Sequence, residues 1–508
     1  MMPRANRRLG QFSASGGWLL ALIFPIGYLA TFTSFTEYPF EYFVLTVLSL
    51  ACLGLLLPVL LSRPLRSVLP VWLALTIFLG AYYCEFYLAV IHPGILDYFP
   101  AIPVSTTPTP EVYLSGYIAI TLGFVAFCCT AWLYYSTRPR RWWTAIQRSF
   151  AEPEGQAPAI NARALIWSAL ALVALNSMVV VQFNMIMGYP REAPLPGHFQ
   201  GFVTYIQLLV VPAMMLGVAC AGVSSKRTRL RNLGVAMLVG YALWNTVLIA
   251  TKGAIVTNLM LLLFLWLVMG LRLGKREVSG AAALLLAAVL AFPFVAAFRA
   301  LRAIGYTMTD ALRPSTLVRA MAYAPGASTS VSAILWQEAL RVTGGGVLLA
   351  LIERRAVPMG LRTFASYLTL DITFTSSYLT VDVFGGPPES FYSFHLVPSM
   401  VGFFYLIAGN LGVVCGVALF TVGALAMWFW LGTLRLRTAA VARILWLYLL
   451  FGAMTEGPMD QELFKILPTF LVVVMLTEWL ARRPTGRRRR YRTVPASGRL
   501  SFPPQGLL

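Results

Sequence analysis

The run SGAAALLLAAVLAFPFVAAF, residues 279–298, is long enough at about 20 residues to cross the ~30 Å hydrocarbon core of a bilayer as a helix. Arg299-Ala300-Leu301-Arg302 follows it directly, and the chain then stays rich in charged and hydroxyl-bearing residues as far as Ser399. This change from apolar to polar sequence predicts a membrane helix that ends where a large polar loop begins.

The composition of the chain excludes an ordinary soluble domain. Of its 508 residues 58% are hydrophobic and only 11% are charged, and the mean hydropathy is +0.74. A soluble protein cannot bury so large an apolar fraction, so the sequence predicts a polytopic, all-α membrane protein.

Apolar windows of membrane-spanning length can be placed about twelve times along the chain. Gly409-Asn410-Leu411-Gly412 is expected to break an entry helix from the tenth span, and Gly346–Ile352 is too short to span, which favours an interfacial or re-entrant helix. The predicted spans cover 17–35, 43–62, 69–91, 113–135, 164–186, 201–222, 233–250, 254–271, 279–298, 400–432, 440–455 and 462–480.

These windows divide the chain into four parts. Residues 1–298 form a membrane domain with spans one to nine, and residues 299–399 form one large loop with interfacial helices. Residues 400–480 return to the membrane with spans ten to twelve. Residues 481–508 form a basic tail that is expected to be disordered.

The formal net charge of +20 follows the predicted topology. Lys and Arg concentrate in alternate connections, and the positive-inside rule then places both termini in the cytoplasm and the large loop outside. The run Arg487–Arg490 is better explained by contact with inner-leaflet lipids than by nucleic acid, so no nucleic-acid partner is expected.

Lys252 lies between two spans, in the turn Thr251-Lys252-Gly253. A lysine among apolar residues needs water, an anion or a carboxylate. It could snorkel to the interface. It could also hold phosphate, with Gly253 permitting close approach of the backbone at a helix start.

Arg299 and Arg302 lie three residues apart, which places them on one helical face where the ninth span meets the loop. A guanidinium binds two phosphate oxygens at once, so this pair suits a diphosphate. The alternative is interfacial anchoring, although the outer ends of membrane helices are usually poor in arginine.

The segment from Gly385 to His395 combines a rigid turn with aromatic and hydroxyl side chains. Tyr392 and its aromatic neighbours suit the stacking of sugar rings, and His395 could move a proton. An interfacial aromatic belt is the alternative. Glu389, Asp382 and Asp371 could act as a base in place of His395. Arg191 belongs to another loop that is expected on the same outer face.

Two further polar features belong to the spans themselves. Glu85 lies within the third span, where an ionisable residue is a functional candidate by default. The turn Met454–Asp460 carries two carboxylates between the last two spans. The sequence contains no nucleotide-binding, zinc-binding or nucleophile-elbow motif, so neither a cofactor nor a metal is expected.

The chain plan resembles that of the Wzy-type O-antigen polymerases, which join oligosaccharide repeat units, and of the related O-antigen ligases. The residues that carry the resemblance are Thr251-Lys252-Gly253, the Arg299/Arg302 pair and the approach Pro398–Tyr405. Asn410-Leu411-Gly412 stands where these polymerases carry a phenylalanine–glycine pair.

The resemblance implies a GT-C-like fold in a bacterial inner membrane, acting without metal on undecaprenyl-diphosphate-linked glycans as donor and acceptor. It implies that Lys252, Arg299 and Arg302 hold the leaving diphosphate and that His395 orients the acceptor hydroxyl. Gly253, Arg191, Glu389 and Tyr392 are then candidate substrate contacts. Membrane lipids and a chain-length-regulator protein are candidate partners.

Three other functions remain open. An O-antigen ligase or another lipid-linked glycosyltransferase would share the chain plan. A lipid-linked-oligosaccharide flippase should show broken helices and polar residues through many spans. A structural scaffold fits the composition but leaves Lys252 and the arginine pair unexplained.

Overall fold

The computed structural model describes helices in several separate parts of the chain. The described residues are 20–91, 108–137, 160–183, 205–249, 253–271, 345–353, 399–434, 436–455 and 467–482, with isolated positions at 203 and from 274 to 318. Within these ranges the protein is helical and has no strand. The predicted all-α class is therefore confirmed.

The helices lie over the predicted apolar windows. Among the described residues, six helical spans are long and apolar enough to cross a membrane, which supports a membrane-embedded protein. The twelve predicted spans and the GT-C-like fold stay predictions. The six spans are Pro39–Leu61, Leu65–Ile91, Pro110–Thr137, Ala162–Gln182, Ile206–Ser224 and Ser399–Thr433, and shorter apolar helices cover Ile23–Phe35, Ala254–Met269, Ala439–Thr455 and Leu467–Ala481.

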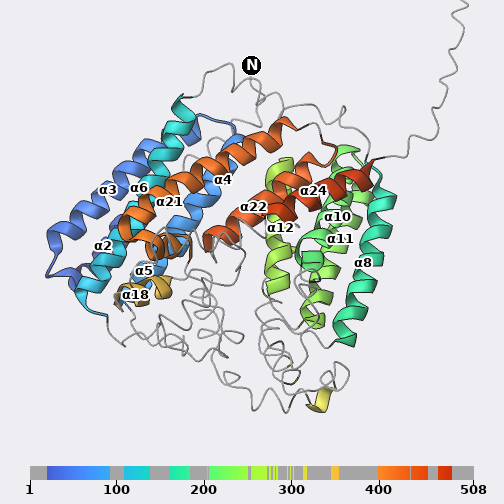
Figure 1. Ribbon diagram of the computed structural model, residues 1–508, viewed down its shortest axis with the longest axis horizontal. Coiled ribbons are helices and arrows are strands. Elements are labelled where there is room, and N and C mark those ends of the chain that lie inside the picture. Colours follow the sequence, from blue (N-terminus) through green and yellow to red (C-terminus); the bar gives the residue numbers. More distant parts are fainter. Residues whose placement is uncertain are drawn as a thin grey trace, which may run out of the picture.

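One group of helices combines those of the first 137 residues with two later helices, α18 and α21 (Figure 1). Its members are α2 (Ile23–Thr31), α3 (Pro39–Leu61), α4 (Leu65–Ile77), α5 (Glu85–Ile91), α6 (Pro110–Thr137), α18 (Gly345–Glu353) and α21 (Ser399–Thr433). A π-helical segment, Phe78–Cys84, joins α4 to α5.

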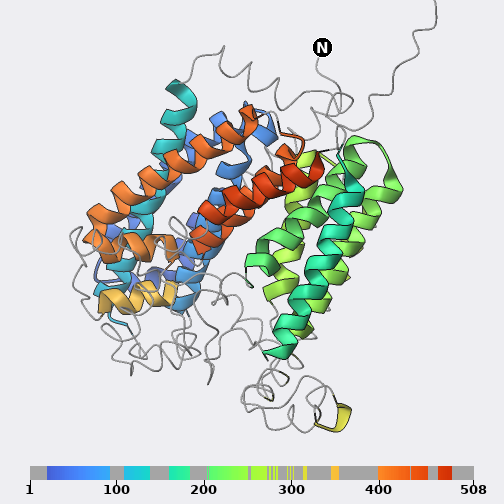
Figure 2. The ribbon, with the colours of Figure 1, turned by 45° about the vertical axis from the view of Figure 1, so that its right-hand side comes forward.

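A second group contains the middle of the chain and its last helix (Figures 1 and 2). Its members are α8 (Ala162–Gln182), α10 (Val211–Ser224), α11 (Thr228–Leu248), α12 (Gly253–Met269) and α24 (Leu467–Ala481). A second π-helical segment, Ile206–Val210, leads into α10. Helix α22 (Ala439–Thr455) lies between the groups and packs against α4 and α21 on one side and α12, α10 and α24 on the other.

The interior of the first group is an aromatic cluster whose hydroxyl groups are hydrogen-bonded to one another. The Tyr117 hydroxyl lies 3.0 Å from Thr46 Oγ1 and 3.1 Å from the Tyr87 hydroxyl. Ser49 Oγ lies 2.9 Å from the Tyr83 hydroxyl. Hydrocarbon offers no competing hydrogen bonds, so these pairs fix how α3, α5 and α6 fit together.

One end of the molecule, where Arg66 and Arg482 lie, is called here the basic end. There Arg66 at the start of α4 donates to the Met269 carbonyl at the end of α12, at 2.7 Å. At the same end the Asn161 N–H before α8 donates to Ala481 O at the end of α24, at 2.9 Å.

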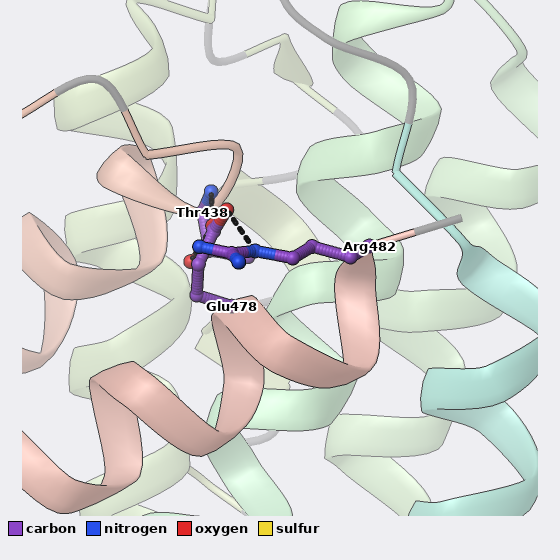
Figure 3. Close-up of polar contacts among 3 residues, drawn as sticks. All are labelled: Thr438, Glu478 and Arg482. Carbon is purple, nitrogen blue, oxygen red and sulfur yellow. Dashed lines mark hydrogen bonds and ion pairs between the residues drawn. The ribbon is translucent and has the colours of Figure 1, made fainter. Parts of the chain in front are cut away.

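Glu478 holds the start of α22 at the basic end (Figure 3). One of its carboxylate oxygens accepts hydrogen bonds from the backbone N–H and from the hydroxyl of Thr438, both at 3.0 Å. Arg482 lies 3.8 Å from the other oxygen. A carboxylate at a helix start also interacts favourably with the helix dipole.

Helix α21 bends sharply where the sequence predicts a break. Ala408 and Gly409 leave helical geometry, and Gly409 has a φ of +60°. Phe404 of the entry segment then lies against the long part of the helix, because Gly412 and Gly416 have no side chain in its way. The predicted break at 409–412 is confirmed. The predicted short helix is also confirmed, at residues 345–353. Its buried residues are Leu348, Leu349 and Leu351, and the helix packs against α21 and α6.

Replacing Gly412 by alanine should destabilise the bend in α21. The new Cβ would lie 2.2 Å from the Phe404 carbonyl oxygen, so the backbone of the entry segment must move. Gly423→Ala on the same helix is the matched control, because a Cβ there meets nothing within 4 Å. We expect a lower midpoint of thermal unfolding in detergent for Gly412→Ala alone, and equal midpoints would contradict the packing described.

Glu478→Ala should lower stability far more than Arg482→Ala. The first change leaves two Thr438 donors without their charged acceptor, a loss of about 2 kcal/mol. The second removes an arginine whose side chain is 65% exposed, a loss of no more than about 0.5 kcal/mol. Thermal unfolding of both variants measures the difference, and similar losses would show that the carboxylate does not hold α22.

Candidate functional site

The predicted site residues fall mostly outside the described residues. Gly253 is described and is the first residue of α12. The predicted residues Lys252, Arg191, Arg299, Arg302, Glu389, Tyr392 and His395 lie outside the described ranges. The structure therefore bears on the site through the elements that flank these positions.

The two ends of the large loop are both attached to the helical core. Phe298 and Leu301, which flank Arg299 and Arg302 in sequence, are helical and buried. At the other end Ser399 is buried and begins α21. Buried, described residues therefore stand near both ends of the predicted loop.

A polar junction, formed by Tyr82, Glu85, Ser399 and Met454, lies where α21 begins. It is at the end opposite the basic end, because α22 finishes there at Thr455. Tyr82 and Glu85 belong to the third span, at and just after the π-helical segment Phe78–Cys84. Such segments in helices frequently occur at functional sites.

Tyr82 connects the three elements that meet at this junction. Its side chain is 1% exposed, and its hydroxyl donates to the Met454 carbonyl of α22 at 2.5 Å. The same hydroxyl lies close to the first residues of α21, Ser399, Met400 and Val401. One phenol therefore ties the third span to the end of α22 and to the start of α21.

Glu85 brings a carboxyl group to the same place. It is 5% exposed and close enough to Tyr82 for its charge to act on the phenol. The start of α21 carries the positive end of a helix dipole, which favours a nearby carboxylate. A buried ionisable group inside a span is costly to keep and usually serves a function.

Ser399 enters α21 in an unusual conformation. Its φ is +60°, a region that a non-glycine residue adopts only at a cost of about 1–3 kcal/mol. Its Oγ accepts a hydrogen bond from the Gly402 N–H at 3.4 Å, which caps the first turn. Ser399 thus begins α21 with a capped first turn.

An apolar cavity lies beside the junction, between α4, α6, α21 and α22. Met400 and Met454 belong to both the junction and the cavity wall. The other lining residues are Pro70, Val71, Ala74, Phe127, Phe420, Thr421, Ala424, Leu425 and Leu450. The cavity is small, and its lining is apolar apart from Thr421.

The start of α12 lies next to the end of α22. The two helices run in opposite directions and pack together, and the Thr257 and Tyr448 hydroxyls are 3.5 Å apart. Gly253 is one turn from Thr257. The structure therefore brings Gly253, the residue after Lys252, and Ser399, four residues after His395, to neighbouring helix ends, with the end of α22 between them.

Sequence reasoning identified Glu85 as a candidate but missed Tyr82. The signal available was a tyrosine three residues before an intramembrane glutamate, which puts both on one helical face. No group of three His, Cys, Asp or Glu side chains that could hold a metal occurs among the described residues.

The comparisons with known proteins return no match. No family model, no curated protein and no solved structure resembles the chain at a significant level.

Tyr82→Phe should impair function beyond its effect on stability. The change removes the hydroxyl that joins Met454 to the start of α21, at a cost of about 1–2 kcal/mol. Tyr135→Phe is the control, because that hydroxyl donates to Ser67 O at 2.8 Å at the basic end. We expect both variants to unfold at lower temperature and only Tyr82→Phe to reduce transfer activity; equal activity in both would exclude a role for the junction.

Proposed function

We propose that the chain is a membrane glycosyltransferase that polymerises undecaprenyl-diphosphate-linked oligosaccharide repeat units for a surface polysaccharide. The observation that carries the proposal is the meeting of α12, α21 and the third span around the end of α22. These helix ends adjoin the segments that contain Lys252 and His395 in sequence.

The proposed reaction needs a site at the membrane surface with an apolar part and a charged part. Apolar side chains near the junction, among them Met400 and Met454, would offer a surface for an isoprenoid chain. Lys252, Arg299 and Arg302 would then hold the diphosphate, where negative charge develops as it leaves. Arg191, Gly253, Glu389 and Tyr392 would contact the glycan.

The transfer itself exchanges one bond for another. The acceptor hydroxyl of the next lipid-linked repeat attacks the anomeric carbon of the growing chain, and the bond from that carbon to the diphosphate breaks. The hydroxyl proton passes to His395, and the diphosphate leaves with the bonding electrons. Fixed cations at the diphosphate lower the barrier without a metal ion.

The charge distribution supports an orientation. The basic end would face the cytoplasm with both termini, and the junction would face the outer side of a bacterial inner membrane. Donor and acceptor glycans are presented on that outer side in the proposed reaction. A chain-length-regulator protein is the proposed protein partner.

Arg299→Ala should abolish polymerisation by the purified protein. Loss of one cation at the leaving diphosphate should reduce the rate on the order of 10²-fold or more, with longer lipid-linked glycans no longer seen as a ladder on a gel. Arg229→Ala, an exposed residue at the basic end, is the control. A full ladder from Arg299→Ala would remove this residue from the proposed clamp.

The same assay separates the polymerase from a ligase. A ligase leaves the lipid-linked repeat unextended until a lipid A core is added as acceptor. Extension of the repeat in the absence of that core supports the polymerase, and extension that depends on the core contradicts it.

A flippase is the second candidate function. Two π-helical segments, Phe78–Cys84 and Ile206–Val210, and the break at Gly409 interrupt three apolar helices. Interrupted helices are typical of transporters. Movement of the lipid-linked repeat across liposomes without extension would favour this function over the enzyme.

A further inference from the structure

Helices α8 and α24 are joined at their basic ends. The Asn161 N–H before α8 donates to the Ala481 carbonyl oxygen at the end of α24, at 2.9 Å, and the two helices pack against each other. Figures 1 and 2 both show the two helix ends side by side. Arg482 follows Ala481 directly, and Arg163 stands two residues after Asn161. These four residues form what is called here the α8–α24 joint, and it brings together two arginines that are far apart in sequence.

Each arginine of the joint has an exposed tryptophan beside it on the same helix. Trp167 is four residues after Arg163 and is 71% exposed, and Trp479 is three residues before Arg482 and is 68% exposed. Spacings of three and four residues place both members of a pair on one helical face. Both arginines are themselves exposed. The same pair of side chains therefore occurs at the basic end of each helix.

Exposed apolar side chains continue each face toward the middle of the membrane. On α24 they are Met475 and Val472, and on α8 they are Leu170 and Met178. Tryptophan is typical of the depth at which lipid headgroups begin, and arginine reaches from there toward water. Each face therefore runs from a hydrocarbon-facing part to a cation, which matches a phospholipid from its acyl chains to its headgroup.

The charges at the joint suit an anion with one negative charge. Arg163 and Arg482 bring two positive charges and Glu478 brings one negative charge, so these three side chains carry a net charge of +1. Glu478 Oε2 already accepts two hydrogen bonds from Thr438. Arg482 lies 3.8 Å from the other oxygen, which is longer than a hydrogen bond. Because an exposed ion pair of this kind is weak, the Arg482 guanidinium remains available to a second anion.

We propose that the α8–α24 joint binds an anionic phospholipid, with the headgroup phosphate at Arg163 and Arg482 and the acyl chains along Trp167 and Trp479. A phosphodiester carries one negative charge, and a guanidinium binds two phosphate oxygens at once. Phosphatidylcholine carries the same phosphate but adds a cation, which the two arginines repel. The site therefore favours phosphatidylglycerol over phosphatidylcholine.

A lipid bound at the joint would hold α24 against α8. It would also act on α22, because Glu478 of α24 accepts both hydrogen bonds from Thr438 at the start of that helix. The bound lipid should therefore stabilise the folded protein. The site lies at the basic end, away from the junction, and does not depend on the proposed glycosyl transfer.

The test is thermal unfolding of the purified full-length protein in detergent micelles with increasing mole fractions of phosphatidylglycerol or phosphatidylcholine. A ligand that binds the folded state raises the unfolding midpoint. We expect phosphatidylglycerol to raise the midpoint more than phosphatidylcholine does. Inorganic phosphate at constant ionic strength should leave the midpoint unchanged, because it has no acyl chains to contact Trp167 and Trp479.

Arg163→Gln and Arg482→Gln should each weaken the binding of phosphatidylglycerol roughly fivefold, the effect of one basic side chain near an anionic lipid surface. The mole fraction that gives half of the midpoint shift measures this change. The double variant should lose the preference for phosphatidylglycerol. Arg229→Gln is the matched control, since Arg229 is an exposed cation in the first turn of α11, outside the joint, and its loss should leave the preference intact.

Equal stabilisation of the wild type by the two lipids would overturn the proposal and leave simple interfacial anchoring as the role of the arginines. A loss in Arg229→Gln as large as in the joint variants would also overturn it, because the effect would then come from general surface charge. Stabilisation by inorganic phosphate equal to that by phosphatidylglycerol would exclude the lipid as the specific ligand. Should the double variant fail to fold, the single variants decide. Polymerase activity does not enter this test, so a failed lipid site and a failed enzyme are distinguished.

Discussion

The absence of water inside a bilayer is the constraint on which this structure depends. Backbone groups are satisfied within helices, and each side-chain hydroxyl or amide must find its partner inside the protein. In the first group that requirement is met by pairs such as Thr46 with Tyr117 and Ser49 with Tyr83. These pairs specify how the helices fit where apolar packing alone would permit several arrangements.

Where helices depart from regular geometry, polar chemistry is close by. The π-helical segment Phe78–Cys84 contains Tyr82 and ends beside Glu85, and the segment Ile206–Val210 contains Gln207. Ser399, with its positive φ, begins the helix that the large loop enters. Irregular backbone within a membrane is tolerated only where neighbouring protein groups satisfy its hydrogen bonds. The positions of these irregular segments therefore indicate candidate functional regions.

The sequence predicts the apolar helices well, because a run of about 20 apolar residues is a local signal. It also predicts the break at Gly409, since two glycines around Asn410-Leu411 weaken a helix locally. It does not predict the bond from Tyr82 to Met454, whose residues are 372 positions apart. Nor does it predict the π-helical segments, because one extra residue in a turn leaves no mark in an apolar run.

The site residues are harder still to place from sequence. Lys252, Arg299 and His395 are recognised by charge and position, and their mutual distances depend on a loop of about a hundred residues whose path no local pattern fixes. What the structure adds is the arrangement of the helix ends beside them. Helix α22 contributes most to it, since it packs against members of both groups.

The hydroxyl network has a consequence for how the protein is made. Thr31 with Tyr42, Thr46 with Tyr117 and Ser49 with Tyr83 all lie within the first quarter of the chain. During synthesis these helices can complete their hydrogen bonds while the ribosome is still translating the middle of the message. Tyr82 is part of the same early bundle, yet its acceptor at Met454 emerges only near the end of translation. The junction is therefore among the last features to close, after the membrane-inserted framework around it has already assembled.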